Sequence, residues 1–181
     1  NYEEESLEWV SLRKALALSI NTITARLGIQ VGLKNIIQTA RQLGIQSELP
    51  AYPALTLGIA ELSPVDLLQA YATIANRGVQ NELTVIRGIV NTTGKNLAHF
   101  VISPKTVFAP GPTDTLIDNL QDVFKYGTAK SAEKMGWNRP AAGKTGTTSN
   151  HRDSWFAGFT PQLTSVVWVG FDQSPDEQLL Q

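Results

Sequence analysis

The stretch from Ala141 to Gly158 contains residues whose types and spacing could perform acyl-transfer chemistry. Its centre reads KTGTT at positions 144–148, a short extended run in which a cation, hydroxyl-bearing residues and a glycine alternate. Neighbouring side chains on a strand point to opposite faces, so Lys144 shares one face with Gly146 while the threonines beside them share the other. Such a strand suits the wall of an acylating active site.

Each residue type in this run has a chemical use. A strand that lines a groove can offer its backbone N–H to a developing oxyanion, and Gly146 lets a peptide approach the main chain closely. The hydroxyl groups of Thr145 and Thr147 could hold a substrate carboxylate, while Lys144 supplies positive potential and a path for a proton. A surface strand that ends in a turn would have a similar sequence, so a second motif is needed to indicate catalysis.

The second motif is Ser19-Ile20-Asn21, far upstream of the first. Ser-x-Asn and Lys-Thr-Gly belong to the three-motif signature of serine enzymes that react with β-lactams. With these motifs in this order, the chain resembles the C-terminal part of the transpeptidase domain of class A, bifunctional penicillin-binding proteins. The resemblance runs from about Trp9 to Phe171 and also includes Arg26-Leu27-Gly28, Leu57-Gly58, Leu62-Ser63-Pro64, Ala70-Tyr71, Ala75-Asn76-Arg77-Gly78, Gly127-Thr128-Ala129 and Asp153-Ser154-Trp155-Phe156-Ala157-Gly158.

The resemblance implies a role for each residue of the two motifs. In this family the serine of Ser-x-Asn passes a proton toward the leaving amine, a role that falls to Ser19, and the asparagine, here Asn21, binds the amide side of the substrate. Lys144 is expected to lie against Ser19 and to polarise its hydroxyl group. Thr145 and Thr147 would bind the terminal carboxylate, with the Thr147 N–H as half of the oxyanion hole. The implied catalytic residues are Ser19, Asn21 and Lys144, and the implied substrate-binding residues are Thr145, Gly146, Thr147 and Thr148.

The nucleophile of the family belongs to a Ser-x-x-Lys motif, which has one match here, Ser11-Leu12-Arg13-Lys14. On an unbroken helix Ser11 and Ser19 would lie roughly 12 Å apart along the axis, whereas a proton relay needs hydrogen-bond reach. In the family this motif also lies much further upstream of Ser-x-Asn. We therefore expect Ser11 to cap a helix, and the nucleophile with its lysine to precede Asn1.

The composition excludes several other classes of function. The chain has 181 residues, 42% of them hydrophobic, enough for one packed domain or a large part of one. Its net charge is −1, so binding to nucleic acid is not expected. The sequence also has no cysteine, and no apolar run in it could span a bilayer. His99 and His151 lack the spacing of metal ligands, so we expect them to be solvated loop residues. The resemblance implies that the reaction needs neither a metal nor an organic cofactor. His151 and Arg152 lie near the motif strand and could rim its cleft.

Apolar periodicity and helix-ending residues predict the elements that position these motifs. A buried helix is predicted from Ser11 toward Gly28, with a break near Asn21 where β-branched residues follow. Ser63 and Pro64 mark the start of the clearest helix, whose predicted core face is formed by Leu67, Leu68, Tyr71, Ile74 and Ala75. The other predicted elements are a helix over 33–43 closed by Gly44, a loop around Pro50 and Pro53, a hairpin over 84–102, a helix that follows Pro110 and Pro112 and ends by Gly127, the motif strand, and a hairpin over 155–171.

This order of elements indicates an α+β domain with an antiparallel sheet. The resemblance narrows it to the serine β-lactamase/penicillin-binding-protein-like transpeptidase fold, incomplete in this chain, with residues 1–181 as the C-terminal portion of the domain. It also implies that the Ser-x-x-Lys segment, a glycosyltransferase domain and an N-terminal membrane anchor precede the chain. The domain would then work on the extracytoplasmic, periplasmic face of the bacterial cell membrane.

The reaction implied by the resemblance is the cross-linking of peptidoglycan. A serine would attack the D-Ala-D-Ala end of a stem peptide, and an amine on a neighbouring strand would accept the acyl group; β-lactams would acylate the same serine. Two alternatives remain open. A D,D-carboxypeptidase or β-lactamase would share the motifs and transfer the acyl group to water, and a non-catalytic ligand-binding or interaction module would fit a chain without the nucleophile.

Overall fold

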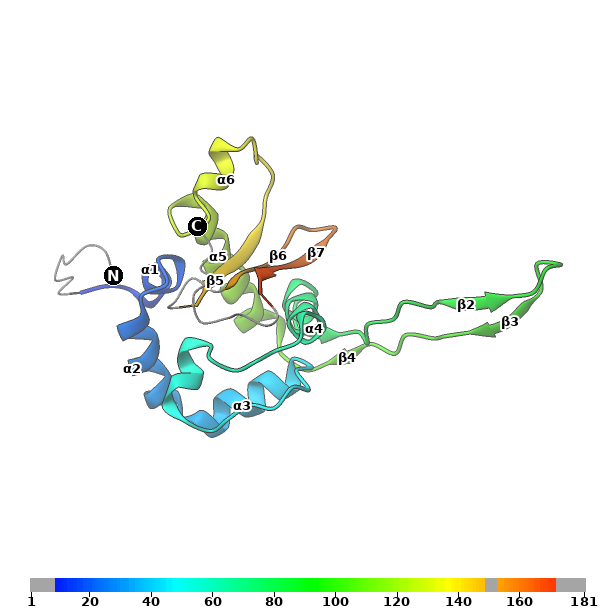
Figure 1. The fold of residues 1–181 in the computed structure, drawn as a ribbon, viewed down its shortest axis with the longest axis horizontal. Helices are drawn as coiled ribbons and strands as arrows, with labels where there is room; N and C mark the ends of the chain where they lie inside the picture. The colour runs from blue at the N-terminus through cyan, green and yellow to red at the C-terminus, as the bar shows by residue number, and fades with distance from the viewer. Residues whose placement is uncertain (1–8, 149–152, 172–181) are drawn as a thin grey trace.

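The computed structural model describes residues 9–148 and 153–171, which form helices and antiparallel strands (Figure 1). The predicted α+β class is confirmed. The helices are α1 Leu12–Ala17, α2 Asn21–Val31, α3 Leu33–Gln42, the 3-10 helix η1 Pro53–Leu57, α4 Pro64–Ala75, α5 Pro110–Lys125 and α6 Ser131–Lys134. The strands are β1 Val79–Gln80, β2 Gly88–Val90, β3 Asn96–His99, β4 Lys105–Thr106, β5 Ala142–Thr147, β6 Asp153–Phe159 and β7 Thr164–Gly170.

The Lys-Thr-Gly motif lies on a three-stranded antiparallel sheet with the order β5-β6-β7. In the register of β5 and β6, Lys144 is opposite Ala157 and Thr145 is opposite Phe156. The chain then turns, with Thr160 N–H donating to the Leu163 carbonyl at 2.8 Å, and β7 returns along β6. The motif strand and the second predicted hairpin are both confirmed.

The core lies between this sheet and the helices α4 and α5. Ile74 of α4 and Leu120 of α5 meet Ala142 of β5 and Phe159 of β6 in one buried cluster. Burial of this apolar surface is the main force that fixes the two helices against the strands. Since Ala142 is only two residues from Lys144, the first part of β5 is fixed by the core while its second part reaches the surface.

Two serine side chains cap helices as the sequence predicts. Ser11 Oγ accepts a hydrogen bond from the Lys14 N–H at 3.2 Å and starts α1, and Ser63 Oγ accepts one from the Asp66 N–H at 3.1 Å and starts α4. Pro64 occupies the first turn of α4, where its missing N–H costs nothing. Ser11 is thus a capping residue in the structure.

The buried face of α4 differs in part from the prediction. Ile74 is buried as expected, and other predicted positions pack around it, but the polar residues Gln69 and Thr73 are buried as well. The Gln69 amide donates to the Asn81 carbonyl at 2.9 Å and accepts from the Leu83 N–H at 3.2 Å. These bonds hold the segment after β1 against α4, which hydrophobic periodicity could not reveal.

Residues 79–106 form an arm that extends away from the body (Figure 1). The predicted hairpin over 84–102 is present, but its strands are shorter: β2 pairs with β3 only over Gly88–Val90, with a register shift at its end. Its turn matches the prediction, because Asn91 Oδ1 accepts from the Lys95 N–H at 2.8 Å. The short ladder between β1 and β4 at the base of the arm was not predicted.

The remaining predictions need small corrections. The helix over 33–43 is confirmed as α3, followed by Gly44 with a φ of 102°. The predicted loop around Pro50 and Pro53 contains the one-turn helix η1, and the segment before the motif strand contains the short helix α6. The helix predicted to follow Pro110 and Pro112 is α5, and it includes both prolines in its first turn.

Helices α1 and α5 are joined by an ion pair around a buried carboxylate. Asp122 is 3% exposed, and its carboxylate accepts hydrogen bonds from Arg13 Nε and, at 2.9 Å, from the Tyr126 hydroxyl group. Lys125 Nζ lies 3.0 Å from its other oxygen. The guanidinium of Arg13 holds the pKa of Asp122 well below its usual range. A carboxylate satisfied in this way is costly to neutralise.

The substitution Asp122→Asn is expected to destabilise the protein by on the order of 2 kcal/mol, because it leaves Arg13 and Lys125 without a buried anion. The effect falls below that of a fully buried pair because the Arg13 side chain is 41% exposed. Denaturant unfolding at neutral pH measures it. The matched control is Asp118→Asn, which removes an exposed partner of the same arginine and should cost well under 1 kcal/mol. Equal losses for the two variants would contradict this assignment.

A close backbone contact also joins α1 to the end of α5. A Cβ added at Gly127 would lie 2.3 Å from the Ala17 carbonyl oxygen, and the Thr128 N–H donates to the same oxygen at 3.1 Å. Only glycine allows this approach.

The substitution Gly127→Ala is therefore expected to lower the unfolding free energy by about 1–3 kcal/mol, through overpacking against a backbone atom. Thermal unfolding would measure the loss. Gly111→Ala, in the first turn of α5, is the control, because an added Cβ there meets nothing within 4 Å and stability should stay the same or rise slightly. A Gly127→Ala protein as stable as the control would contradict this, because it would show that the contact between Gly127 and Ala17 can widen at no cost.

Candidate active site

The two sequence motifs meet at one hydrogen bond. Lys144 Nζ donates to Ser19 Oγ at 2.9 Å, although the two residues are separated by 125 positions in the sequence. Lys144 comes from β5 and Ser19 from the turn between α1 and α2, so the contact depends on how α1 and the sheet pack around α5. The arrangement matches the one expected between Lys144 and Ser19, while the catalytic roles of both residues stay predictions.

The helix break predicted near Asn21 positions the serine. Helix α1 ends at Ala17, Ser19 has a φ of 56°, and α2 begins at Asn21. The Ile20 N–H donates to the Ala15 carbonyl at 2.9 Å, which ties the turn to α1. This left-handed turn exposes the Ser19 side chain at the surface, and Asn21 is exposed at the start of the next helix.

The amine of Lys144 belongs to a half-buried side chain. It also donates to the Thr145 carbonyl at 2.9 Å, and burial lowers the pKa of the lysine below its usual value. Because the ammonium donates to Ser19 Oγ, the hydroxyl hydrogen of Ser19 remains available for another acceptor. A serine held in this way can pass a proton outward, which is the chemistry expected of it.

The threonines of the motif strand differ in their surroundings. Thr145 is half-buried, and its Oγ1 lies 2.6 Å from Oγ1 of Thr128. Thr147 is exposed near the end of β5, opposite Ser154. Thr148 follows the strand, and its Oγ1 accepts a hydrogen bond from the Asp153 N–H at 3.2 Å.

Gly146 lies between these threonines, opposite Trp155 in β6. A Cβ added at Gly146 would make only an ordinary contact, 3.4 Å from Cβ of Trp155. The glycine is therefore not required by the packing of the sheet. Its value would lie in the close approach that it allows to the main chain of β5.

Sequence reasoning missed the contact between Thr128 and the motif strand. The segment Gly127-Thr128-Ala129 belongs to the resemblance in the sequence, but the sequence predicts no site role for Thr128. The structure instead brings its hydroxyl group to Thr145. The available signal was a hydroxyl-bearing residue directly after a glycine that ends a helix. That local pattern does not predict which strand the hydroxyl group contacts.

The sequence offered three other candidates, two histidines and an arginine. His99 belongs to β3 in the arm, and His151 and Arg152, which could rim the cleft, lie outside the described residues. Within residues 9–148 and 153–171, no three His, Asp or Glu side chains come together as a metal site would require. The same residues include no helix that is both long and apolar enough to cross a bilayer.

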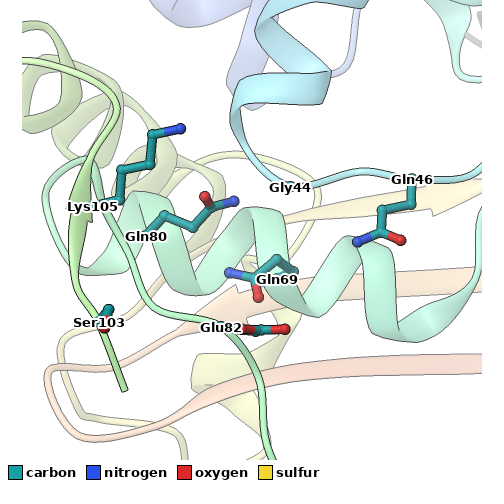
Figure 2. Close-up of a pocket in the computed structure, with 7 residues that line it drawn as sticks. All are labelled: Gly44, Gln46, Gln69, Gln80, Glu82, Ser103 and Lys105. Carbon is teal, nitrogen blue, oxygen red and sulfur yellow. The ribbon is translucent and has the colours of Figure 1, made fainter. Parts of the chain in front are cut away.

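A pocket of about 240 Å³ lies at the base of the arm (Figure 2). Polar side chains line it, including those of Gln46, Gln69, Gln80 and Glu82. The hydrogen bonds of Gln69 already serve to hold the arm to α4. A Cβ at Gly44 would lie 2.5 Å from Cγ of Gln69, so the pocket also contains a tightly packed wall. These features explain the pocket as part of the arm's attachment.

Comparison with known proteins assigns this fold and site to a class. The Penicillin binding protein transpeptidase domain family matches residues 1–178. The chain therefore belongs to the penicillin-binding protein transpeptidase family, as the sequence motifs predicted.

Individual relatives agree with the family. The chain is 37% identical over 172 residues to penicillin-binding protein 1A of Aquifex aeolicus and 34% identical over 180 residues to penicillin-binding protein 1B of Haemophilus influenzae. These matches cover 95% and 99% of the chain but 23% of each relative, so the chain spans about a quarter of their length.

Solved structures share the fold. The crystal structure of penicillin-binding protein 1A from Haemophilus influenzae has a TM-score of 0.80 at 25% identity, covering 90% of this chain and 30% of that one. The PonA1 protein from Mycobacterium tuberculosis in complex with penicillin V has a TM-score of 0.75 at 25% identity, covering 88% of this chain and 47% of that one. The expected transpeptidase fold is confirmed.

The amine of Lys144 is expected to titrate below the usual lysine pKa of about 10.4, because burial disfavours its charged form. Isotope-edited NMR of the lysine side chains measures this, and Lys144→Arg assigns the resonance by removing it. The unfolded chain keeps this proton to a higher pH, so the lysine adds stability as pH rises from its lowered pKa toward 10.4. A pKa at or above the usual value would contradict the burial of the amine.

Proposed function

We propose that the chain is the C-terminal part of a D,D-transpeptidase domain that cross-links peptidoglycan stem peptides through a serine acyl-enzyme. The observation that carries the proposal is the 2.9 Å hydrogen bond from Lys144 to Ser19, because it joins the two motifs expected to form one wall of the cleft. The family match supports the same class of reaction.

In the first step, a serine oxygen attacks the carbonyl carbon between the two D-Ala residues of a donor peptide. The electron pair of the carbonyl moves to its oxygen, and the N–H of Thr147 stabilises the resulting oxyanion. The bond to the leaving nitrogen then breaks. The proton released by the attacking serine passes by way of its lysine to Ser19, and Ser19 donates its own hydrogen to that nitrogen while Lys144 holds the hydroxyl group in place. D-Ala leaves, and the donor remains as an ester on the enzyme.

The donor peptide is held by residues along β5 and at the start of α2. Asn21 binds the amide side of the peptide, and the hydroxyl groups of Thr145 and Thr147 bind its terminal carboxylate. Gly146 allows the peptide to approach the strand, and Thr148 completes the binding surface at the end of the motif.

In the second step, an amine of a neighbouring stem peptide attacks the ester carbonyl and releases the serine. The same groups serve this step in reverse, with Ser19 accepting a proton from the attacking amine. β-Lactams resemble the D-Ala-D-Ala end and acylate the same serine, which makes them inhibitors. The complex of PonA1 with penicillin V supports binding of such ligands to this fold.

The nucleophile and its lysine are proposed to precede Asn1, in the N-terminal part of the same domain. Ser11, the first residue of the match to Ser-x-x-Lys in this chain, uses its oxygen to cap α1. The chain covers 23% of each of two relatives, so most of their length lies outside the match and leaves room for such a segment. A glycosyltransferase domain and a membrane anchor would precede it in turn and hold the domain on the extracytoplasmic side.

The full-length protein is expected to form a covalent adduct with labelled penicillin, and Lys144→Ala is expected to slow acylation by at least about a hundredfold, because it removes the group that holds Ser19. Peptide mapping of the adduct is expected to identify a serine upstream of Asn1. The measurement is the second-order rate constant of acylation together with the mapped site.

Ser11→Ala is the matched control, since it removes a helix cap and should leave the acylation rate unchanged. Labelling of Ser11 itself would refute the placement of the nucleophile. Supplying a donor peptide with and without an amine acceptor then separates cross-linking from hydrolysis. If only the hydrolysed donor forms, even when the acceptor is present, the result would favour a carboxypeptidase or β-lactamase.

A further inference from the structure

The contact between Thr128 and Thr145 has a consequence for how the motif threonine can bind an anion. The two Oγ1 atoms are 2.6 Å apart, within the range of an O–H···O hydrogen bond. Each threonine hydroxyl group has one hydrogen and two lone pairs. One hydroxyl group must therefore donate to the other, and one hydrogen of the pair remains for a third group.

The position of Thr128 is fixed by the backbone around it. Its N–H donates to the Ala17 carbonyl at 3.1 Å, and the following residue, Ala129, is buried with its N–H bonded to the Val123 carbonyl at 3.0 Å. The preceding Gly127 packs against Ala17. The side chain of Thr128 is nevertheless exposed, so its hydroxyl group is not needed to fill the core.

These constraints decide the direction of the hydrogen bond when an anion is bound. If Thr145 donated to Thr128, its only hydrogen would be used and it could not donate to a carboxylate. If Thr128 donates to Thr145, the hydrogen of Thr145 is free to point at the anion. Hydrogen bonds in such a chain polarise and strengthen one another, and a bond to a charged acceptor is stronger than a neutral one.

We propose that Thr128 is a positioning residue that orients the hydroxyl group of Thr145 for binding the carboxylate of the substrate or of a β-lactam. This inference rests on the proposed function. It assigns to Thr128 a role through Thr145 and no direct contact with the reacting atoms. It also places one of the groups that determine carboxylate recognition on the segment after α5, outside the motif strand.

The test measures the second-order rate constant for acylation of the full-length protein by a penicillin that has its free carboxylate. Thr128→Val keeps the shape of the side chain and removes the donor, and we expect the rate constant to fall about tenfold, in line with a lost hydrogen bond in a charged network. Thr128→Ser restores the hydroxyl group and should return the rate constant to within about twofold of the original. The matched control is Thr115→Val, which changes an exposed threonine on α5 itself and should leave the rate constant unchanged.

A double-mutant cycle separates action through Thr145 from an independent effect. Thr128→Val added to Thr145→Val should cause almost no further loss. Additive losses, or failure of Thr128→Ser to restore the rate, would overturn the proposal, as would an unchanged rate for Thr128→Val. If the original protein forms no adduct with penicillin, the proposed function fails, a result distinct from any of these.

Discussion

The ion pair between Arg13 and the buried carboxylate of Asp122 is the contact on which the geometry of the site depends. It fixes α1 to α5 at the start of α1, and the close approach of Gly127 to Ala17 fixes the same two helices at its end. Between these points the direction of α1 is determined. The turn that follows α1 therefore emerges beside β5, where Lys144 can reach Ser19.

The sheet supplies the second half of this arrangement. At the start of β5, Ala142 and Gly143 are buried, and added side-chain atoms at Gly143 would collide with the Ala157 backbone and the Phe156 ring. Toward its end, the strand becomes exposed at Thr147. One strand thus combines a rigid, core-packed beginning with an accessible end, which is the combination that a preorganised binding surface needs.

Much of this could be read from the sequence, because local signals with a clear physical cause were present. The caps at Ser11 and Ser63 and the break before Asn21 depend on residues close in the chain. The contact of Thr128 with Thr145 and the burial of Gln69 depend on partners from other elements. Their register and distance are set by tertiary packing, so neither composition nor periodicity could predict them.

The left-handed backbone at Ser19 restricts which hydroxyl-bearing residue can occupy this position. Threonine carries the same oxygen, but its branched Cβ is strained at a φ of 56°, whereas serine tolerates it at lower cost. An evolutionary change from serine to threonine would keep the functional group and lose the turn that presents it. The identity of this residue is thus constrained by backbone stereochemistry, in addition to the proton transfer proposed for it, and threonine is a poor replacement although it keeps the hydroxyl group.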